Sequence, residues 1–414
     1  MMMKNTRYNL LFVFCILSTG FLSAQAVPAL KSWLALEASS RPSFLTQSFA
    51  NESLTKKQTK EVVAMLMSDK EQQLKRSLAD EWKAQAFREG SHELKFEYKI
   101  FGEKPKNGRS LFISMHGGGN TAPRVNDQQW KNQVGLYKPA EGVYIAPRAP
   151  TNTWNLWHEG HIDTLFDRLI EASIIFEGVN PDKVYIMGYS AGGDGVYQLA
   201  PRMADRWAAA SMMAGHPNET SPLSLRNLPF TIHVGALDNG FNRNEIAKRW
   251  AVMLDSLHQL DPGGYNHLVQ VHEGRPHWMN REDTVAVTWM AAFVRNTIPE
   301  KIVWKQDDMH HESFYWLGVP AVSAKTGGEV VASYKGNNIN VEKNYSDTLV
   351  VFLDDRMVNL NRALTVTYQG TQIFKGKVKR SMPVIYQTIQ KRKDPGLVFS
   401  ARLLIVNGKV MDKS

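Results

Sequence analysis

A serine stands between two glycines in the pentapeptide Gly188-Tyr189-Ser190-Ala191-Gly192. The apolar run 183–187 before it is typical of a strand, and an amphipathic segment begins after it. Where a chain turns sharply from strand to helix, the positions two before and two after the central residue approach each other, so both must be glycine. The turn strains the backbone of the serine and exposes its hydroxyl, as a nucleophile requires. The N–H of Ala191, at the start of the helix, would face negative charge that develops on a substrate oxygen.

A glycine-rich loop, His116-Gly117-Gly118-Gly119-Asn120, comes directly after the earlier apolar run 111–115. Glycine lets the backbone approach a bound carbonyl oxygen without interference from a side chain. We therefore expect the N–H of Gly118 or Gly119 to be a second donor to that oxygen. An ordinary glycine-rich turn is the alternative.

A catalytic serine needs a base, and the base needs a carboxylate that orients it. Asp238 follows the apolar run 230–234. Because the carboxyl ends of parallel strands meet at one edge of a sheet, Asp238 would face the same edge as Ser190. The alternative reading is an aspartate of a loop or a helix cap. Asp194 is a weaker rival, since it lies on the helix that follows the serine.

His277 is the candidate base. It lies in the loop Gly274–Trp278 after the apolar run 268–271, where its ring could reach both Ser190 and Asp238. His272 competes with it from the end of that run, and His233 within a strand is expected to be a packed side chain. The order serine, aspartate, histidine along the chain matches that of enzymes with a strand–turn–helix nucleophile.

Two tryptophans are candidates for contact with a substrate. Trp157 lies in the loop after the run 143–146, and Trp278 adjoins His277. Ordinary core packing is an equal alternative for both.

Possible metal ligands gather in the same part of the chain, namely His158, Glu159, His161 and Asp163. Loop spacing of this kind is a weak signal, and a serine nucleophile works without a metal. We expect neither a metal nor another cofactor.

Apolar runs alternate with amphipathic stretches such as 163–177 and 244–260 between residues 94 and 300. This pattern predicts an α/β fold, a mostly parallel sheet with helices on both faces. Residues 27–93 have helical periodicity with a capping box at Thr55–Gln58. Residues 301–414 alternate at a period of two, with hairpin signals at Gln369-Gly370 and Asn407-Gly408, which predicts a separate C-terminal antiparallel β-sandwich-like domain.

Residues 1–26 have the features of an export signal. Lys4 and Arg7 precede an apolar run from Leu10 to about Leu22, and Ala24-Gln25-Ala26 has the pattern that signal peptidase cleaves. We expect cleavage after Ala26, a secreted or periplasmic protein, and no membrane span in the mature chain; an uncleaved anchor is the alternative. Cys15, the only cysteine, would leave with the signal, which excludes disulfides and thiol chemistry.

The chain is basic, with 49 Lys and Arg against 40 Asp and Glu. Its basic residues are scattered among acidic ones, and the cluster Lys391-Arg392-Lys393 is followed at once by Asp394. This distribution favours a solvated surface over a nucleic-acid interface.

The Gly188–Gly193 turn, the His116–Gly119 loop and the Gly274–Trp278 loop resemble those of the polyhydroxybutyrate-depolymerase-like and feruloyl-esterase-like branch of the α/β hydrolases. The resemblance covers about residues 94–299. It implies a triad of Ser190, Asp238 and His277, an acyl-enzyme, and a small or polymeric carboxylic ester as substrate. A serine peptidase of the prolyl-peptidase type and a non-catalytic glycan-binding protein remain alternatives. The sequence leaves the oligomeric state open.

Overall fold

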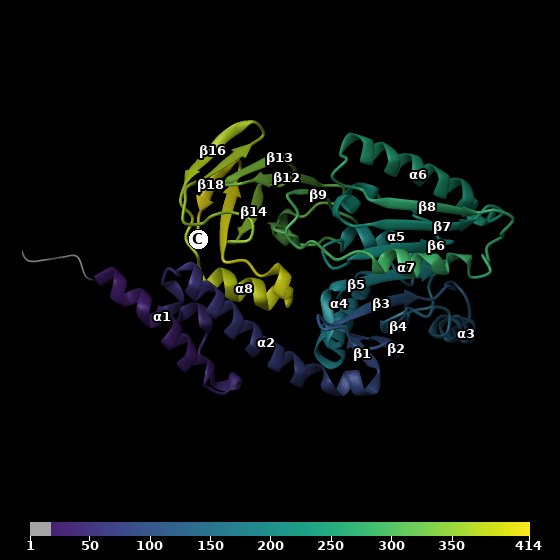
Figure 1. Ribbon diagram of the computed structural model, residues 1–414, viewed down its shortest axis with the longest axis horizontal. Coiled ribbons are helices and arrows are strands. Elements are labelled where there is room, and N and C mark those ends of the chain that lie inside the picture. Colours follow the sequence, from purple (N-terminus) through teal and green to yellow (C-terminus); the bar gives the residue numbers. More distant parts are fainter. Residues whose placement is uncertain (1–17) are drawn as a thin grey trace, which may run out of the picture.

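The computed structural model describes residues 18–414, and its largest element is an eight-stranded sheet (Figure 1). The strand order is β1-β2-β4-β3-β5-β6-β7-β8. Strands β3 to β8 are parallel to their neighbours, whereas β2 runs antiparallel to β4 and β1 antiparallel to β2. The bounds are β1 Ala86–Glu89, β2 His92–Phe101, β3 Arg109–Met115, β4 Gly142–Arg148, β5 Val179–Tyr189, β6 Ala209–Met213, β7 Phe230–Gly235 and β8 His267–His272.

Helices cover both faces of this sheet, as the βα alternation predicts. One apolar cluster joins α3 (Pro123–Val134) and α7 (Val285–Ala291) to alternate residues of β3, β4 and β5, such as Phe112, Tyr144 and Tyr185. A second cluster joins α4 (Gly160–Glu177), α5 (Ala191–Arg202) and α6 (Arg243–Leu260) to the opposite face. The predicted fold class is confirmed, and both predicted crossover helices begin within three residues of α4 and α6.

The C-terminal region contains two five-stranded sheets, ordered β10-β11-β14-β17-β18 and β16-β15-β13-β12-β9. The first comprises β10 Ser313–Phe314, β11 Leu317–Gly318, β14 Thr348–Leu353, β17 Ala401–Val406 and β18 Lys409–Asp412. The second comprises β9 Lys301–Lys305, β12 Glu329–Lys335, β13 Asn338–Asn344, β15 Leu364–Tyr368 and β16 Thr371–Gly376. Both predicted hairpin turns are present, with positive φ at Gln369, Gly370, Asn407 and Gly408.

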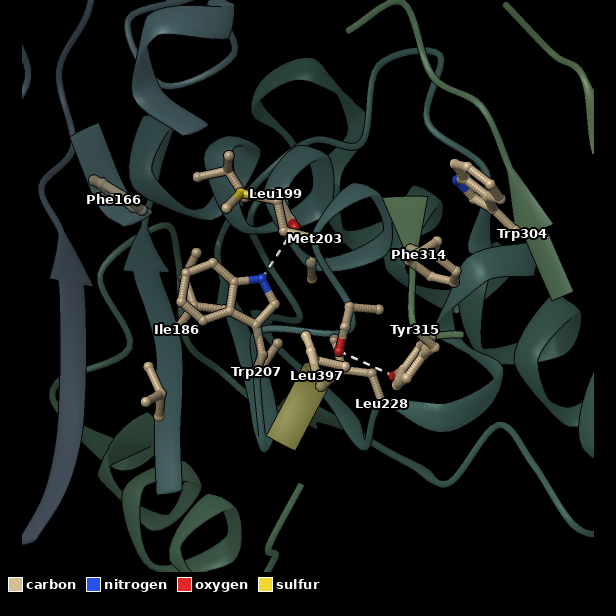
Figure 2. Close-up of a cluster of buried hydrophobic side chains, with 14 of the residues drawn as sticks. Phe166, Ile186, Leu199, Met203, Trp207, Leu228, Trp304, Phe314, Tyr315 and Leu397 are labelled. Atoms are coloured by element: carbon tan, nitrogen blue, oxygen red, sulfur yellow. Dashed lines mark hydrogen bonds between the residues drawn. The ribbon is translucent and has the colours of Figure 1, made fainter. Parts of the chain in front are cut away.

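The predicted antiparallel sheets of this region are confirmed, with two differences. Strand β13 pairs with β15 in parallel, and the region contains a helix, α8 (Met382–Arg392), which the period-two pattern did not predict. The region also packs on the large sheet and its helices. Its Trp304, Phe314, Tyr315 and Leu397 belong to the same apolar cluster as Leu199 and Trp207 of the large-sheet domain (Figure 2).

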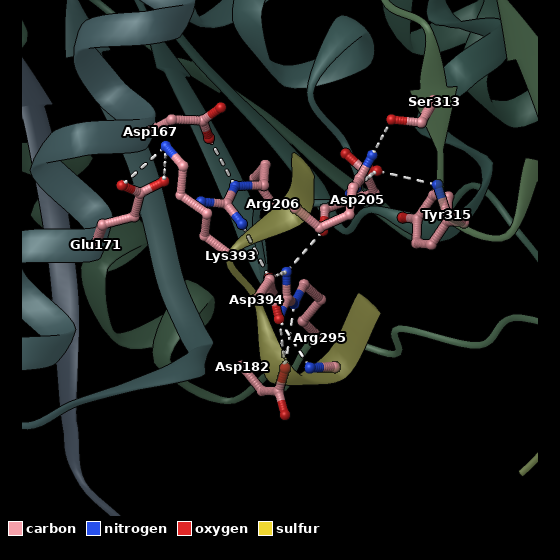
Figure 3. A network of polar contacts seen from close by, with 12 residues as sticks. Asp167, Glu171, Asp182, Asp205, Arg206, Arg295, Ser313, Tyr315, Lys393 and Asp394 are labelled. Carbon is pink, nitrogen blue, oxygen red and sulfur yellow. Dashed lines mark hydrogen bonds and ion pairs between the residues drawn. The ribbon is translucent and has the colours of Figure 1, made fainter. Parts of the chain in front are cut away.

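A buried ionic network also crosses this junction (Figure 3). The Asp394 carboxylate accepts hydrogen bonds from Arg295 Nη1 at 2.7 Å and from Arg206 Nη1 at 3.0 Å. The Asp394 side chain is 3% exposed. Because two guanidinium groups face it, the pKa of Asp394 is lowered to about 2 in spite of its burial. The end of α8 is therefore held against the large-sheet domain by charge as well as by apolar contact.

The N-terminal helical region bridges the two halves of the molecule. Helix α2 (Lys56–Ala84) begins at the predicted capping box, in which Thr55 and Gln58 exchange hydrogen bonds. It runs beneath both halves (Figure 1) and packs on α4 and β1 at one end and on α8 at the other. Helix α2 ends at Ala84 and not at Gly90, because Gln85 adopts the left-handed conformation that caps the helix. Strand β1 and the start of β2 therefore come before residue 94, where we expected the sheet to begin.

Helix α1 (Ser18–Leu34) contains the point at which we expect signal cleavage. The charged start and much of the apolar run of the expected signal fall on residues 1–17, outside the described residues. Ala26, Leu30 and Trp33 are buried in an apolar cluster with residues of α2 and α8. No helix between residues 18 and 414 has both the length and the apolar character needed to cross a bilayer.

Candidate active site

Ser190 lies at the sharp turn between β5 and α5 with φ 57° and ψ −122°. This backbone conformation is strained for a residue other than glycine. A Cβ atom on Gly188 would lie 2.2 Å from the carbonyl oxygen of Gly192, and one on Gly192 would lie 2.2 Å from the carbonyl oxygen of Met115. The two glycines are thus required by close backbone approach, as the sequence predicts.

The structure brings Ser190, His277 and Asp238 into one hydrogen-bonded chain. His277 Nε2 lies 3.0 Å from Ser190 Oγ, and His277 Nδ1 lies 2.8 Å from Asp238 Oδ2. The Asp238 side chain is only 2% exposed, whereas that of His277 is 43% exposed. A buried carboxylate that accepts from Nδ1–H leaves Nε2 free to accept the serine proton. The three residues come from the carboxyl ends of β5, β7 and β8.

The side chains of the other candidate acid, Asp194, and of the other candidate bases, His272 and His233, form hydrogen bonds with groups other than Ser190 and His277. Asp194 Oδ1 accepts a hydrogen bond from the backbone N–H of His216 at 2.6 Å, and burial raises its pKa to about 6. His272 Nε2 lies 3.2 Å from His233 Nδ1, and both rings are buried. Burial lowers the pKa of His233 to about 3, so this ring is a neutral packed side chain, as expected.

Tyr189 holds the loop that carries His277, a role that the sequence reading missed. Its hydroxyl donates to the carbonyl oxygen of His277 at 2.6 Å and accepts from the N–H of Met279 at 3.0 Å. The residue occupies the variable position before the serine, where the motif itself gives no signal. The position nevertheless faces the base loop, so a tyrosine there can tie the nucleophile turn to the base.

The expected oxyanion donors are the backbone N–H groups of Ala191 and of Gly118 or Gly119, which lie in the turn after Ser190 and in the glycine loop. Ala191 is the first residue of α5, and N–H groups in a first helical turn have no acceptor within the helix. Gly117 abuts the nucleophile, because a Cβ atom on it would lie 3.0 Å from Ser190 Cβ. The N–H of Gly119 is unsuited to this role, because it donates to Asn126 Oδ1 at 2.9 Å. Of the two expected loop donors, Gly118 is therefore the one left.

Asn126 on α3 is a second residue that the sequence reading missed. A Cβ atom on Gly118 would lie 2.2 Å from its Oδ1, so the loop passes directly over this side chain. Asn126 Nδ2 in turn donates to Asn152 Oδ1 at 2.8 Å. The Asn126 amide therefore holds the glycine-rich loop in place. The only sign of this role in the sequence is an asparagine in the first turn of the helix that follows the loop.

Trp157 takes the core-packing role, which is one of the two alternatives that the sequence left open. Trp157 is fully buried, and its indole N–H donates to the carbonyl oxygen of His116 at 2.9 Å. A Cβ atom on Gly195 would lie 2.5 Å from Trp157 Cβ, so the residue packs directly on α5. It supports the start of the glycine loop from the core side. Burial also lowers the pKa of His116 to about 4, which keeps that ring neutral.

Trp278 is placed differently. It is 48% exposed, and its ring lies 5.6 Å from that of Tyr189, beside His277. Trp154, in the loop after β4, is 60% exposed and contacts His158 edge-on at 5.4 Å. The exposed Trp278 ring therefore lies beside the residue that precedes Ser190, and Trp278 remains a candidate for contact with a substrate.

The four possible metal ligands around the start of α4, His158, Glu159, His161 and Asp163, are not brought together as a set. Asp163 pairs with Arg202 and with His311 Nε2, the latter at 2.8 Å. The carbonyl of His158 accepts from Arg202 Nη1 at 2.9 Å, and burial lowers the pKa of its ring to about 4. Glu159 and His161 do lie together, with His92 as an unforeseen neighbour.

Comparisons with known proteins identify similar structures and no similar sequence. No protein-family model matches the chain, and no curated protein matches it. A thermostable esterase aligns over 51% of this chain and 62% of its own, with 17% identity and a TM-score of 0.39. This chain thus spans less than two thirds of that esterase.

Two further structures align over half of this chain. Poly(aspartic acid) hydrolase-1 from Sphingomonas sp. KT-1 matches over 50% of this chain and 96% of its own, with 16% identity and a TM-score of 0.39. A feruloyl esterase module from Clostridium thermocellum matches over 50% and 86%, with 12% identity and a TM-score of 0.36. The fold assignment rests on this chain's own topology: the mostly parallel eight-stranded sheet, with a strained serine at the turn after its central strand β5, has the fold of an α/β hydrolase.

Proposed function

We propose that this chain is an exported serine hydrolase that cleaves carboxylic esters through an acyl-enzyme. The observation that carries the proposal is the position of His277, hydrogen-bonded at once to Ser190 and to Asp238. A strained serine whose hydroxyl faces an imidazole, itself oriented by a buried carboxylate, is the arrangement required for nucleophilic catalysis.

In the proposed reaction, Ser190 Oγ attacks the carbonyl carbon while His277 Nε2 takes the hydroxyl proton. The oxyanion accepts hydrogen bonds from the N–H groups of Ala191 and Gly118. Asp238 stabilises the imidazolium that forms. When the tetrahedral intermediate collapses, His277 gives the proton to the departing alcohol, and the acyl group remains on Ser190. Water then attacks the acyl-enzyme by the same route and releases the acid.

An ester rather than an amide is proposed because the nucleophile turn, the glycine loop and the Gly274–Trp278 loop resemble those of esterases. The exposed Trp278 beside the base is suited to a flat or apolar acyl group, which could be an aromatic acid or a hydroxyalkanoate. A panel of acetyl, feruloyl and hydroxybutyryl esters, assayed beside dipeptide amides, distinguishes an esterase from a peptidase. Faster turnover of the amides would favour the peptidase alternative.

The nucleophile is tested by covalent labelling with a fluorophosphonate probe. Wild type should label with one equivalent, and Ser190→Ala should not label. Ser256→Ala is a matched control, because the Ser256 hydroxyl is exposed on α6 and bonds only to the Val252 carbonyl of its own helix. Equal labelling of wild type and Ser190→Ala would show that another residue is the nucleophile.

The export part of the proposal rests on residues 1–26. If the signal is cleaved after Ala26, N-terminal sequencing of the protein recovered from outside the cytoplasm should begin at Val27. Leu30 and Trp33 would then stay in the mature chain and keep their contacts with α2 and α8. A full-length chain retained in the cytoplasm would contradict this part and leave the chemistry untouched.

A further inference from the structure

Three potential metal ligands converge where α4 begins. One ligand atom from each of His92, Glu159 and His161 lies within 4.8 Å of the other two, and this is the only such group of three among residues 18–414. None of these residues belongs to the proposed catalytic machinery. The sequence separates His92 from the other two by more than sixty positions, so their meeting is a product of the fold.

The three side chains stand on firmly held backbone. His92 is the first residue of β2 and pairs with Glu89 across the β1–β2 turn. Glu159 is the residue that precedes α4, and His161 is the second residue of that helix. Helix α4 packs directly on β1. The relative positions of the three residues are therefore set by the pairing of β1 with β2 and by its packing on α4.

The polar atoms of this group are incompletely satisfied within the protein. His161 is 10% exposed at its side chain, and its Nε2 atom is buried with no hydrogen-bond partner in the described part of the chain. Glu159 Oε1 accepts the hydroxyl of Thr153 at 3.0 Å, while Oε2 faces His161 Nδ1 at 3.4 Å, beyond a good hydrogen bond. A buried polar atom without a partner is costly, and a bound ion is one way to satisfy the group around it.

The two imidazoles are stacked, with centroids 3.7 Å apart and planes 6° from parallel. Two imidazolium ions would repel each other strongly at this separation. Repulsion between two charged rings at this distance therefore favours a pair with at least one neutral imidazole, which is the form that binds metals.

We propose that His92, Glu159 and His161 bind one divalent cation of the zinc type. Two nitrogens and one carboxylate oxygen suit Zn²⁺, whereas Ca²⁺ and Mg²⁺ require oxygen ligands. Ligand bonds of about 2.0–2.2 Å require the two rings to tilt out of their parallel stack, so that their lone pairs converge. A water molecule would occupy the fourth position.

The consequence of binding would be structural, because the site adjoins the glycine loop. Glu159 is joined through its carboxylate to the hydroxyl of Thr153. The carbonyl oxygen of Thr153 lies 3.1 Å from the position that a Cβ atom of Gly119 would occupy. A cation held by Glu159 would therefore fix the loop between β4 and α4 against the loop that contains the proposed oxyanion donor.

The test is titration of the full-length chain with Zn²⁺ after treatment with EDTA, followed by calorimetry, with Co²⁺ absorption as the report on ligand geometry. Wild type should bind one equivalent, and Co²⁺ should give the visible bands of a tetrahedral site. Loss of an outer partner of a metal ligand typically costs about 10–100-fold in affinity, so loss of a ligand should cost at least as much. His92→Gln, Glu159→Gln and His161→Gln should each weaken binding to that extent.

His267→Gln is the matched control, because His267 is also a part-buried histidine beside a carboxylate, with Nε2 3.1 Å from Asp255 Oδ1. This variant should bind like wild type. If His161→Gln fails to fold, His92→Gln still decides the matter, because His92 lies beside an exposed turn. Absence of stoichiometric binding, or equal affinity of wild type and His92→Gln, would overturn the proposal. Neither result would bear on labelling of Ser190, so the metal site and the proposed hydrolase activity fail independently.

Discussion

Replacement of Asp394 by asparagine should loosen the junction between the large-sheet domain and the C-terminal region. The carboxylate accepts three hydrogen bonds from Arg206 and Arg295 and a fourth from the N–H of Gly396. The variant keeps the shape of the side chain and removes its charge. Asp182 would then be the remaining salt-bridge partner of Arg295, and Asp167 that of Arg206. The side chains of these two aspartates are 37% and 43% exposed.

The magnitude follows from two independent estimates. Removal of one partner from a buried ion pair typically costs about 3–5 kcal/mol. The shift of the Asp394 pKa from 3.8 to about 2 corresponds to about 2 kcal/mol of stabilisation by the charge. Since each arginine keeps one acid, we expect a loss of about 2–3 kcal/mol in the free energy of unfolding.

The pH dependence has a defined sign. The folded-state pKa of Asp394 lies below its unfolded value, so its contribution is complete above about pH 4 and is lost as the pH falls toward 2. The difference between wild type and Asp394→Asn should therefore shrink across this window. Other acids also titrate between about pH 4 and pH 2. The test is therefore the difference in stability between wild type and Asp394→Asn at each pH, and not the wild-type curve alone.

The assay is urea unfolding followed by tryptophan fluorescence and far-ultraviolet circular dichroism. Asp394→Asn should separate the unfolding of the two halves into two transitions, because the network joins them. Asp412→Asn is the control: its pair with Arg402 at 3.2 Å is 42% and 34% exposed, so its loss should cost less than about 1 kcal/mol. Equal effects of the two substitutions would refute the reasoning.

Three further substitutions test the site. Asp238→Asn should lower kcat by about 10⁴-fold with little change in KM, because the His277 tautomer would be wrong; a loss below tenfold would exclude Asp238 as the orienting acid. Tyr189→Phe removes two hydrogen bonds to the base loop and should lower kcat about tenfold while Ser190 still reacts with a fluorophosphonate, and an unchanged kcat would contradict its positioning role. Burial raises the folded-state pKa of Asp194 to about 6, so its carboxyl lowers the stability of the fold as the pH rises from about 4 to about 6. Asp194→Asn should therefore stabilise the protein by about 1–3 kcal/mol at pH 7 and by less at pH 4, and a loss of stability at pH 7 would contradict this sign.

More of the candidate active site than of the surrounding structure could be predicted, because each of its residues lies next to a strand that the sequence itself indicates. Ser190, Asp238 and His277 each follow an apolar strand at the same sheet edge, and the strand pattern fixes that edge. The sequence left the role of Trp157 open, because the position of an aromatic residue in a loop does not show whether its side chain points to the core or to solvent. Only the packing against Gly195 decides that it points inward.

The C-terminal region and the proposed cation site depend on contacts between distant segments. Helix α8 begins with Met382-Pro383, and its apolar side chains pack in a cluster with α1 and α2. The sequence of α8 alone does not show that these helices cover it. His92 could not be grouped with Glu159 and His161 before β1 and β2 were known to form a hairpin against α4. The spacing of apolar residues shows which face of a helix or strand is buried, but not which other element covers that face.

The bridging helix α2 places a constraint on the order in which this chain can fold. Lys70 Nζ donates to Gln390 Oε1 at 2.7 Å, across 320 residues of sequence. A ribosome that adds about 5–20 residues per second needs roughly 15–65 s to supply that partner. During this interval α8 is not yet there to cover the apolar faces of α1 and α2, so their burial can be completed only late in synthesis.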